Sequence, residues 1–362
     1  MVFVAERGMD VLSRNLEDYP EGIIVPVDKP YRWTSADVVR KLKFAAKKHF
    51  GQKNIKVGHA GTLDPLATGV LVVCIGKATR LAEQIQASDK EYVAGITFGA
   101  TTPSFDLEKP IDKFYPTDGV TEGALNRALE GFIGEQEQVA PVFSAKLVDG
   151  VRSYKLARKG LATAPSAEVA TTPSSEVAKA TSAEEAAPSS ALLRNPIREN
   201  ATEGTASSAS MPKSSIIRIN DIALLSFRPH SSLSFRPSPS LSFRPSEARG
   251  EISTPLRPLD CARGDKELIA RGDKEMIAQG DNNPSSRINV TDNSGLGLPH
   301  AEIRVSCSKG TYIRALARDL GASLDSGAHL DSLYRTACGN FTAEKALNIQ
   351  EAIALFNQQP QL

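Results

Sequence analysis

The chain has 362 residues, a formal net charge of +1 and 41% hydrophobic residues, which is typical of a soluble protein with two or three domains. No run of 18 or more apolar residues occurs, so we expect no membrane span, and Glu6 and Arg7 argue against a secretory signal. The four cysteines form no paired motif and the five histidines show no metal-ligand spacing. We therefore expect a reducing, cytoplasmic location, no disulfide framework and no metal.

The first predicted helix begins near residue 35. Thr34 or Ser35 can cap it, and the apolar residues that follow keep helical spacing, namely Val38, Val39, Leu42 and Ala45. Seven cations and no acid lie between residues 40 and 56, namely Arg40, Lys41, Lys43, Lys47, Lys48, Lys53 and Lys56. This basic run is able to follow nucleic-acid phosphates, although a solvated helix face is the simpler alternative.

The most constrained stretch of the chain is Gly58-His-Ala-Gly-Thr-Leu-Asp-Pro-Leu-Ala-Thr-Gly69, which holds one carboxylate, Asp64. Pro65 pushes Asp64 toward an extended backbone, and the glycines permit backbone angles that a side chain would forbid. The apolar run 70–75 follows at once and predicts a buried strand. A loop of this kind can hold a reactive carboxylate still, or it is a tight turn in which Asp64 only binds backbone amides.

The rest of the chain alternates strand and helix patterns. Residues 92–98 and 302–307 alternate as half-buried strands do, and 216–225 also reads as a strand. After Thr311, apolar residues recur at i, i+3, i+4 and i+7 and mark an amphipathic helix that Gly321 could end. This mixture predicts an α+β fold with a largely antiparallel central sheet and flanking helices.

Two segments do not read as folded core. Residues 161–210 are dominated by Ala, Ser and Thr, with related hexapeptides starting at Pro165, Pro173 and Thr181. Residues 229–298 lie in a second repetitive region, in which Ser-Phe-Arg-Pro starts at Ser226, Ser234 and Ser242. Such stretches bury little apolar surface, so we interpret them as surface insertions. An added RNA-binding arm, with Arg and Phe interleaved, is the functional alternative for the second.

Four motifs in order resemble the TruB-type tRNA pseudouridine synthases, a family that isomerises uridine 55 in the T-arm of tRNA. In chain order they are Val27-Asp-Lys-Pro30, the Asp64 segment described above, which begins at Gly58, Ser88-Asp-Lys-Glu-Tyr92, and Cys307-Ser-Lys-Gly-Thr-Tyr-Ile-Arg314. The resemblance implies the pseudouridine synthase fold. It divides the chain into catalytic-domain parts at 1–160, 215–228 and 299–362, with a low-complexity insertion at 161–214 and a repeat-rich insertion at 229–298.

The resemblance also implies roles for a carboxylate and an arginine. Asp64 stands at the position of the family's essential aspartate, acting on a flipped-out uridine by attack on the base, attack on the sugar or proton removal. Arg314 lies where the family pairs an arginine with that aspartate, and its guanidinium can grip the carboxylate through two bonds. A snorkelling side chain beside the apolar stripe is the alternative for Arg314. The reaction needs neither a redox agent nor a metal, so we expect no cofactor.

The resemblance further implies five substrate contacts. Tyr92 would stack on the flipped base, and Leu333 would contact it, with core packing the alternative for both. Lys29 lies near the family's pocket, and His59 would stack on or hydrogen-bond to RNA. Asp106 aligns with a family aspartate near the site, although Pro103 here replaces an acid of the usual Thr-Asp-Thr-x-Asp pattern.

These observations favour a cytoplasmic, monomeric pseudouridine synthase that acts on the T-arm of tRNA without a metal, a cofactor or a membrane. A non-catalytic tRNA-binding and folding protein is the alternative from another class, and a synthase for another RNA is a third. The joint presence of Asp64, Tyr92 and Arg314 favours the enzyme. The chain ends about 30 residues after Leu333, so we expect no full C-terminal RNA-binding domain.

Overall fold

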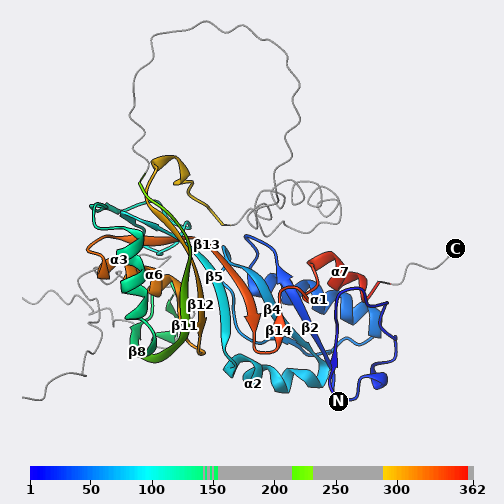
Figure 1. The fold of residues 1–362 in the computed structure, drawn as a ribbon. Coiled ribbons are helices and arrows are strands. Elements are labelled where there is room, and N and C mark those ends of the chain that lie inside the picture. Colours follow the sequence, from blue (N-terminus) through cyan, green and yellow to red (C-terminus); the bar gives the residue numbers. More distant parts are fainter. Residues whose placement is uncertain (142, 145–146, 149–150, 154–213, 231–287, 358–362) are drawn as a thin grey trace, which may run out of the picture.

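The computed structural model describes residues 1–141, 143–144, 147–148, 151–153, 214–230 and 288–357 (Figure 1). Apart from their ends, both predicted insertions lie outside the described residues. Residues 288–298, at the end of the second one, contact the folded part of the chain. Arg32 Nη2 donates to the Ile288 carbonyl at 2.6 Å, and the Thr291 N–H donates to the Leu107 carbonyl at 2.9 Å. The insertion boundaries stay a prediction.

A single ten-stranded sheet runs through the described structure (Figure 1). Its main path has the order β1-β2-β4-β13-β5-β12-β11-β8. Only the β1–β2 and β4–β13 pairs are parallel, and the other neighbours are antiparallel. The strands are β1 Phe3–Val4, β2 Ile23–Lys29, β4 Thr68–Ile75, β5 Lys90–Phe98, β8 Gly134–Val139, β11 Ser214–Arg228, β12 His300–Cys307 and β13 Ala328–Cys338.

Short elements complete the fold. β3 Val57–His59 pairs with β4, and β14 Phe341–Thr342 pairs with β13. Two small hairpins join β6 Ala100–Thr101 to β7 Lys113–Phe114 and β9 Leu147–Val148 to β10 Val151–Arg152. The α-helices are α1 Ser35–Phe50, α2 Ala82–Ala87, α3 Glu122–Glu130, α6 Ile313–Ser323 and α7 Ile349–Ala354, and 3₁₀ turns cover Leu16–Asp18, Gly76–Leu81 and Ser294–Leu296.

The two faces of the sheet bury different residues because side chains alternate along a strand. On β4, Leu71 and Val73 join the large core that also holds residues of α1, α3, α6 and α7, whereas Val70 and Val72 join a smaller core beneath α2. Helices α1, α3, α6 and α7 thus cover one face of the sheet, and α2 covers the other. The predicted α+β class with a mostly antiparallel sheet is confirmed. None of the described helices is long and apolar enough to cross a membrane.

The predicted helix at residue 35 is α1, and Thr34 is its cap. The Thr34 hydroxyl accepts from the Asp37 N–H, and the Asp37 carboxylate accepts from the Thr34 N–H, which forms a reciprocal capping box. At the other end Gly51 has a φ of 63°, the left-handed conformation in which helices commonly end. The start of α1 is therefore set by local sequence.

The predicted helix after Thr311 is α6, but it does not end at Gly321. It continues to Ser323, and Gly321 lies inside it. A Cβ on Gly321 would lie 2.7 Å from the Cβ of Ala328, closer than two carbons can approach. Gly321 thus permits close packing of α6 against β13 rather than the end of the helix.

Gly69 lies where β4 pairs with β13, opposite Arg335. Its φ is +95°, and a Cβ there would lie 2.2 Å from the Arg335 carbonyl oxygen. Gly58, in the same motif, has no positive φ, and a Cβ added to it would meet no atom within 4 Å. Gly69 is therefore required by its backbone angle and by the nearby β13 backbone, whereas neither constraint applies to Gly58.

We predict that Gly69→Ala destabilises the protein by about 2–4 kcal/mol, because a side chain there meets both backbone strain and the β13 backbone. Urea unfolding of the full chain measures this change. Gly58→Ala is the matched control and is expected to alter the free energy of unfolding by less than about 0.5 kcal/mol. Equal changes in the free energy of unfolding for the two variants would contradict a special steric role for Gly69.

Candidate active site

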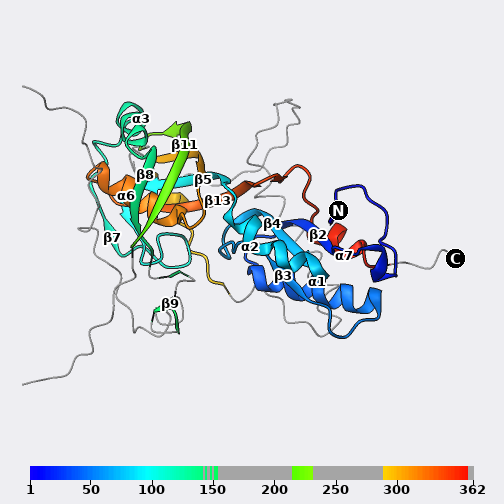
Figure 2. The ribbon, with the colours of Figure 1, turned by 90° about the horizontal axis from the view of Figure 1, so that it is seen from below.

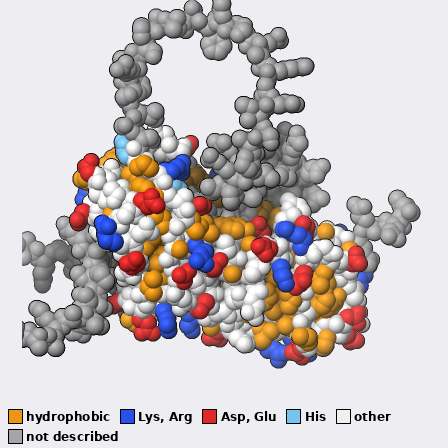
Figure 3. All heavy atoms as spheres, in the orientation of Figure 1, with side chains coloured by type: hydrophobic (Ala, Val, Ile, Leu, Met, Phe, Trp, Pro, Cys, Tyr) orange, Lys and Arg blue, Asp and Glu red, His pale blue; other side chains and the backbone are white. Residues whose placement is uncertain are grey.

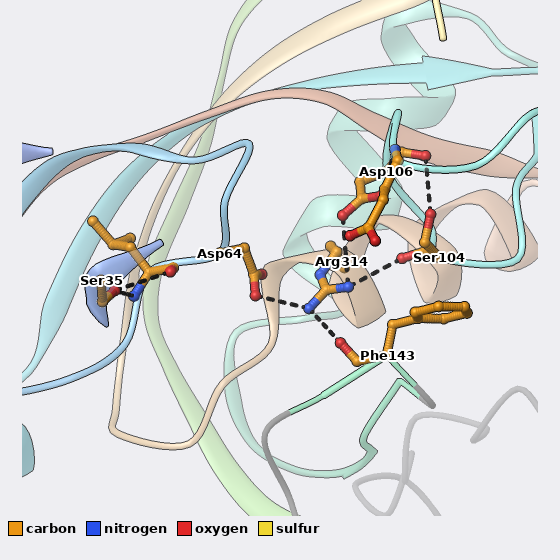
Figure 4. Close-up of polar contacts among 8 residues, drawn as sticks. Ser35, Asp64, Ser104, Asp106, Phe143 and Arg314 are labelled. Atoms are coloured by element: carbon orange, nitrogen blue, oxygen red, sulfur yellow. Dashed lines mark hydrogen bonds and ion pairs between the residues drawn. The ribbon is translucent and has the colours of Figure 1, made fainter. Parts of the chain in front are cut away.

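The backbone on either side of Asp64 is fixed by the start of α1. The Ser35 hydroxyl donates to the Leu63 carbonyl at 3.1 Å and accepts from the Leu63 N–H at 2.9 Å. The Arg32 N–H donates to the Pro65 carbonyl at 2.9 Å. Asp64 thus lies between Leu63 and Pro65, whose peptide groups are hydrogen-bonded to Ser35 and Arg32. Figure 4 shows Ser35 beside the Asp64 loop.

Lys29, at the end of β2, is fully buried and also holds this loop. Its Nζ donates to the carbonyls of Pro30, Trp33 and Pro65 at 2.9, 2.7 and 3.2 Å. Burial lowers the pKa of Lys29 to about 7, and the nearby Asp64 carboxylate opposes that shift. In this structure Lys29 contacts protein backbone, and its predicted contact with substrate is not tested.

Arg335, on β13, is a second buried cation beside the same loop. Its Nε donates to the Val70 carbonyl at 2.7 Å, and its Nη2 donates to the Gly61 carbonyl at 3.2 Å. Arg335 also lies opposite Tyr92 in the β5–β13 register. Arg335 therefore joins the Asp64 loop to the strand that carries Tyr92.

Arg314 and Asp64 form an ion pair across 250 residues of sequence (Figure 4). Arg314 Nη2 lies 2.9 Å from Asp64 Oδ1, and no second bond to that carboxylate forms, so the expected two-bond grip is replaced by a single one. The Arg314 side chain is only 5% exposed, whereas that of Asp64 is 38% exposed. The pair thus joins a buried cation to a carboxylate that solvent or substrate can reach.

The rest of the Arg314 guanidinium contacts oxygens from three segments. Nη2 donates to the Phe143 carbonyl at 2.9 Å, Nη1 donates to the Ser104 carbonyl at 3.3 Å, and Nη1 lies 3.6 Å from Asp106 Oδ2. Burial tends to lower the pKa of Arg314, but Asp64 and Asp106 outweigh it, so the net shift is upward. Burial raises the pKa of Asp106, and Arg314 opposes that shift. Two acids therefore flank one permanently charged guanidinium.

The start of α6 sets the position of Arg314. Gln138 of β8 binds both peptide groups of Tyr312, accepting from its N–H at 2.8 Å and donating to its carbonyl at 3.2 Å. Tyr312 is the N-cap residue of α6 and has no side-chain capping bond. A buried amide from the edge strand thus replaces the usual local cap, and Arg314 follows two residues later.

A cleft opens beside the ion pair. Its walls come from the Asp64 loop, the Asp106 segment, α6 and β13, and it is lined by Asp64, Leu66, Ala67, Asp106, Leu107, Arg314, Leu330, Asp331, Ser332 and Leu333. Four of the residues singled out from the sequence, Asp64, Asp106, Arg314 and Leu333, therefore meet at one place. The roles assigned to them stay predictions.

Tyr92 and His59 are not among the residues that line this cleft. Tyr92 is 8% exposed and belongs to the large core, and burial raises its pKa to about 12. His59 is half-buried on β3, and burial, followed by repulsion from Arg335, lowers its pKa. Its Nδ1 is buried without a hydrogen-bond partner among the described atoms. Stacking of Tyr92 on a base and an RNA contact of His59 stay predictions.

The basic run lies on α1 and the loop after it. Arg40, Lys48, Lys53 and Lys56 are exposed, and Lys41, Lys43 and Lys47 are half-buried. The face of the molecule in Figure 3 shows cations and anions interspersed. Within the described chain, no group of three or more potential metal ligands lies together, and the expectation of no metal or cofactor stays a prediction.

Sequence reasoning does not reveal three residues that hold the site together, namely Ser35, Gln138 and Arg335. The sequence indicates Ser35 only as a helix cap, although its hydroxyl binds Leu63. Gln138 lies in a polar strand without any motif. The sequence does hold a signal for Arg335. It lies two residues after Leu333, and on a strand two such residues share a face, so Arg335 is expected on the same side as Leu333.

We predict that the stability of the wild type relative to Lys29→Met rises between pH 7 and pH 8.5. Above pH 7 the folded protein holds Lys29 largely neutral, while the unfolded chain, with a pKa near 10.5, still binds the proton. The unfolded state therefore binds more protons, and raising the pH favours folding by up to about 1.4 kcal/mol per pH unit. Urea unfolding at several pH values measures the slope, and exposed Lys48→Met is the control. Parallel slopes for wild type and Lys29→Met would contradict a neutral buried lysine.

Comparisons with known proteins agree with the motifs. The description "TruB family pseudouridylate synthase (N terminal domain)" fits residues 47–187. The chain is 34% identical to a tRNA pseudouridine synthase B of Phocaeicola vulgatus, covering 94% of this chain and 96% of that protein. For the proteins of the same name from Bacteroides fragilis and Deinococcus radiodurans, the identities are 33% and 28%, and 97% and 77% of those proteins are covered.

A solved structure described as a Cbf5-Nop10-Gar1 complex is 17% identical to this chain, with a TM-score of 0.44 and coverage of 99% of this chain and 68% of that one. That likeness is too low to support a conclusion. The matches to the relatives at 33–34% identity span nearly the whole length of those proteins. The chain therefore belongs to the TruB family of pseudouridylate synthases, which are isomerases.

Proposed function

We propose that this protein converts uridine 55 in the T-arm of tRNA to pseudouridine, with Asp64 as the catalytic carboxylate. The observation that carries the proposal is the Asp64–Arg314 ion pair in a cleft that Leu333 also lines. The relatives are named for a tRNA substrate, and the motif resemblance supplies position 55.

The reaction exchanges one bond of the ribose for another. The bond between N1 of uracil and C1′ breaks and a bond between C5 and C1′ forms. The proton originally on C5 is released to solvent, and N1 takes up a proton from solvent, so the product is an isomer of the substrate. The base must leave its stack to enter a protein site, at a cost of a few kcal/mol. Asp64 is the most exposed of the three acids that line the cleft. Its side chain is 38% exposed, against 27% for Asp331, which is bonded to His300, and 9% for Asp106.

Arg314 acts in this proposal by holding Asp64 in place. A guanidinium that is bound to Ser104, Phe143 and Asp106 has little freedom to rotate, so the carboxylate bound to it is restrained in turn. Preorganisation of this kind favours reaction because the reacting groups need not be ordered at each turnover. Asp106 supplies a second negative charge to the buried arginine.

The flipped uracil would lie between Leu333 and the Asp64 loop, with Tyr92 beneath it and His59 and Lys29 behind the loop. The seven cations between residues 40 and 56 would bind the RNA backbone, with an affinity that falls steeply as salt rises. We further propose a cytoplasmic monomer, and the buried free thiols of Cys74, Cys307 and Cys338 are compatible with a reducing compartment.

We predict that wild-type protein releases tritium from a tRNA transcript labelled at C5 of uridine, from position 55 alone. Asp64→Asn keeps the size of the side chain but loses its charge, and release is expected to fall by at least about 10³-fold. A filter-binding assay on the same transcript is the control for folding and RNA affinity. Binding without release by the wild type would leave the non-catalytic tRNA-binding protein, and equal release by both proteins would remove Asp64 from the mechanism.

We predict that Arg314→Lys lowers kcat by about 100-fold with a smaller change in KM, because an ammonium cannot make the several directed bonds of the guanidinium and Asp64 shifts. The same tritium assay measures both parameters. Arg318→Lys is the matched control, since Arg318 is also buried and lies one turn further along α6. A comparable loss in both variants would mean that disruption of α6, rather than the Asp64 contact, accounts for the effect.

A further inference from the structure

Phe44 is the large hydrophobic residue that α1 exposes to solvent. The helix packs its other apolar residues inward, with Val38, Leu42, Ala45, Ala46 and Phe50 buried, whereas Phe44 is 73% exposed. Single exposed apolar residues are common and need no special explanation. What sets Phe44 apart is the identity of its neighbours on the helix surface.

All four helical neighbours of Phe44 are cations. Residues at i−4, i−3, i+3 and i+4 surround a side chain on a helix surface, and here these positions hold Arg40, Lys41, Lys47 and Lys48. The single acid of α1, Asp37, is 5% exposed and belongs to the capping box. The result is an aromatic ring enclosed by positive charge, which we call the Phe44 platform and define by Phe44 and these four cations.

Phe44 is 73% exposed, so most of its surface is open to solvent. Cations commonly lie over aromatic faces, and the described structure has such contacts at Phe105, Tyr115 and Phe143, but Phe44 is in none of them. Arg40, which is paired with Asp37 at 2.7 Å, keeps its side chain 68% exposed. The platform therefore offers both an exposed aromatic ring and accessible positive charge.

We propose that the Phe44 platform binds an unstacked nucleotide of the RNA substrate, with the base on the Phe44 ring and the adjoining phosphates among the four cations. Aromatic rings set in basic surfaces are the usual means of holding unpaired nucleotides without sequence preference. The inference rests on the proposed function, because it assigns a second contact to the RNA whose uridine lies at Asp64.

The platform lies within reach of the same RNA molecule. The first turn of α1 is bonded to the Asp64 loop through Ser35 and Leu63, and Phe44 lies nine residues further on, about 14 Å along the helix axis. Figure 2 shows α1 at the outer edge of the described structure. An RNA that fills the Asp64 cleft can thus extend along α1 to Phe44.

An anionic membrane is the competing partner for a basic helix with an aromatic residue. Helices that lie on membranes present a broad apolar face to the lipid, whereas the apolar face of α1 is buried in the large core and Phe44 stands alone on the outer face. The observations therefore favour nucleic acid.

The test is a fluorescence-anisotropy titration of an unmodified tRNA transcript with the full-length protein and its variants. Phe44→Ala and Phe44→Leu remove the aromatic face, and we expect each to weaken binding roughly 5- to 10-fold. Phe44→Tyr keeps the face and should bind as the wild type does. Ile133→Ala is the matched control, because Ile133 is also exposed, at 52%, and follows α3 rather than α1.

Salt dependence separates stacking from charge. Lys48→Gln removes a phosphate contact and should reduce the slope of log K against log salt by about 0.7 to 0.9, whereas Phe44→Leu should leave that slope unchanged. Binding of Phe44→Ala or Phe44→Leu equal to that of the wild type overturns the proposal. So does a loss of binding to phosphatidylserine vesicles by Phe44→Ala with tRNA binding intact, since that result would assign the surface to a membrane.

Turnover distinguishes this inference from the proposed function. Tritium release by Phe44→Ala should show a KM raised about 5- to 10-fold with kcat close to the wild-type value, because Phe44 lies far from the reacting bond. If the wild type binds the transcript but releases no tritium, the proposed function fails while the anisotropy titration still decides the platform. If the wild type releases tritium and Phe44→Ala has an unaltered KM, the proposal for the Phe44 platform is overturned while the proposed function stands.

Discussion

The Asp64 loop depends on buried basic side chains that donate hydrogen bonds to backbone carbonyls. Lys29 reaches the Pro65 carbonyl, Arg335 reaches the Gly61 carbonyl, and Arg314 binds the Asp64 side chain and the Ser104 and Phe143 carbonyls. A buried charge is costly unless it is paired or hydrogen-bonded, and a carbonyl dipole directed at a cation offsets part of that cost. The three basic side chains come from β2, β13 and α6, so the loop is fixed only when these distant segments are assembled.

This arrangement explains why the loop is rich in glycine and proline although it is not loose. Gly69 lets the chain turn into β4 against the β13 backbone, where a Cβ has no room. The Pro65 carbonyl accepts hydrogen bonds from both the Arg32 N–H and Lys29 Nζ. Close backbone approach and backbone hydrogen bonds therefore fix this loop, and the Asp64 side chain stays partly exposed at the cleft.

Structural features that depend on residues close together in the chain are predictable from the sequence. Features that depend on contacts between residues far apart in the chain are not. The cap at Thr34, the strands at 92–98, 216–225 and 302–307, and the stripe of α6 all follow from short-range patterns. The prediction that Gly321 ends α6 is wrong because the role of that glycine depends on Ala328 of the next strand. The bonds of Gln138 to Tyr312 and of Arg335 to Gly61 join residues 174 and 274 positions apart, and no local pattern marks such pairs.

Helix α1 connects the chemistry to the RNA surface. Its first turn binds the residue before Asp64, and its outer face carries the Phe44 platform. Its C-terminal end is anchored by His49, whose two ring nitrogens lie 3.0 Å from the carbonyls of Phe356 and Ser13. A helix fixed at both ends behaves as one rigid element. RNA bound along it is therefore held in a constant relation to the carboxylate, and a contact far from the reacting bond can help to place the uridine without taking part in the chemistry.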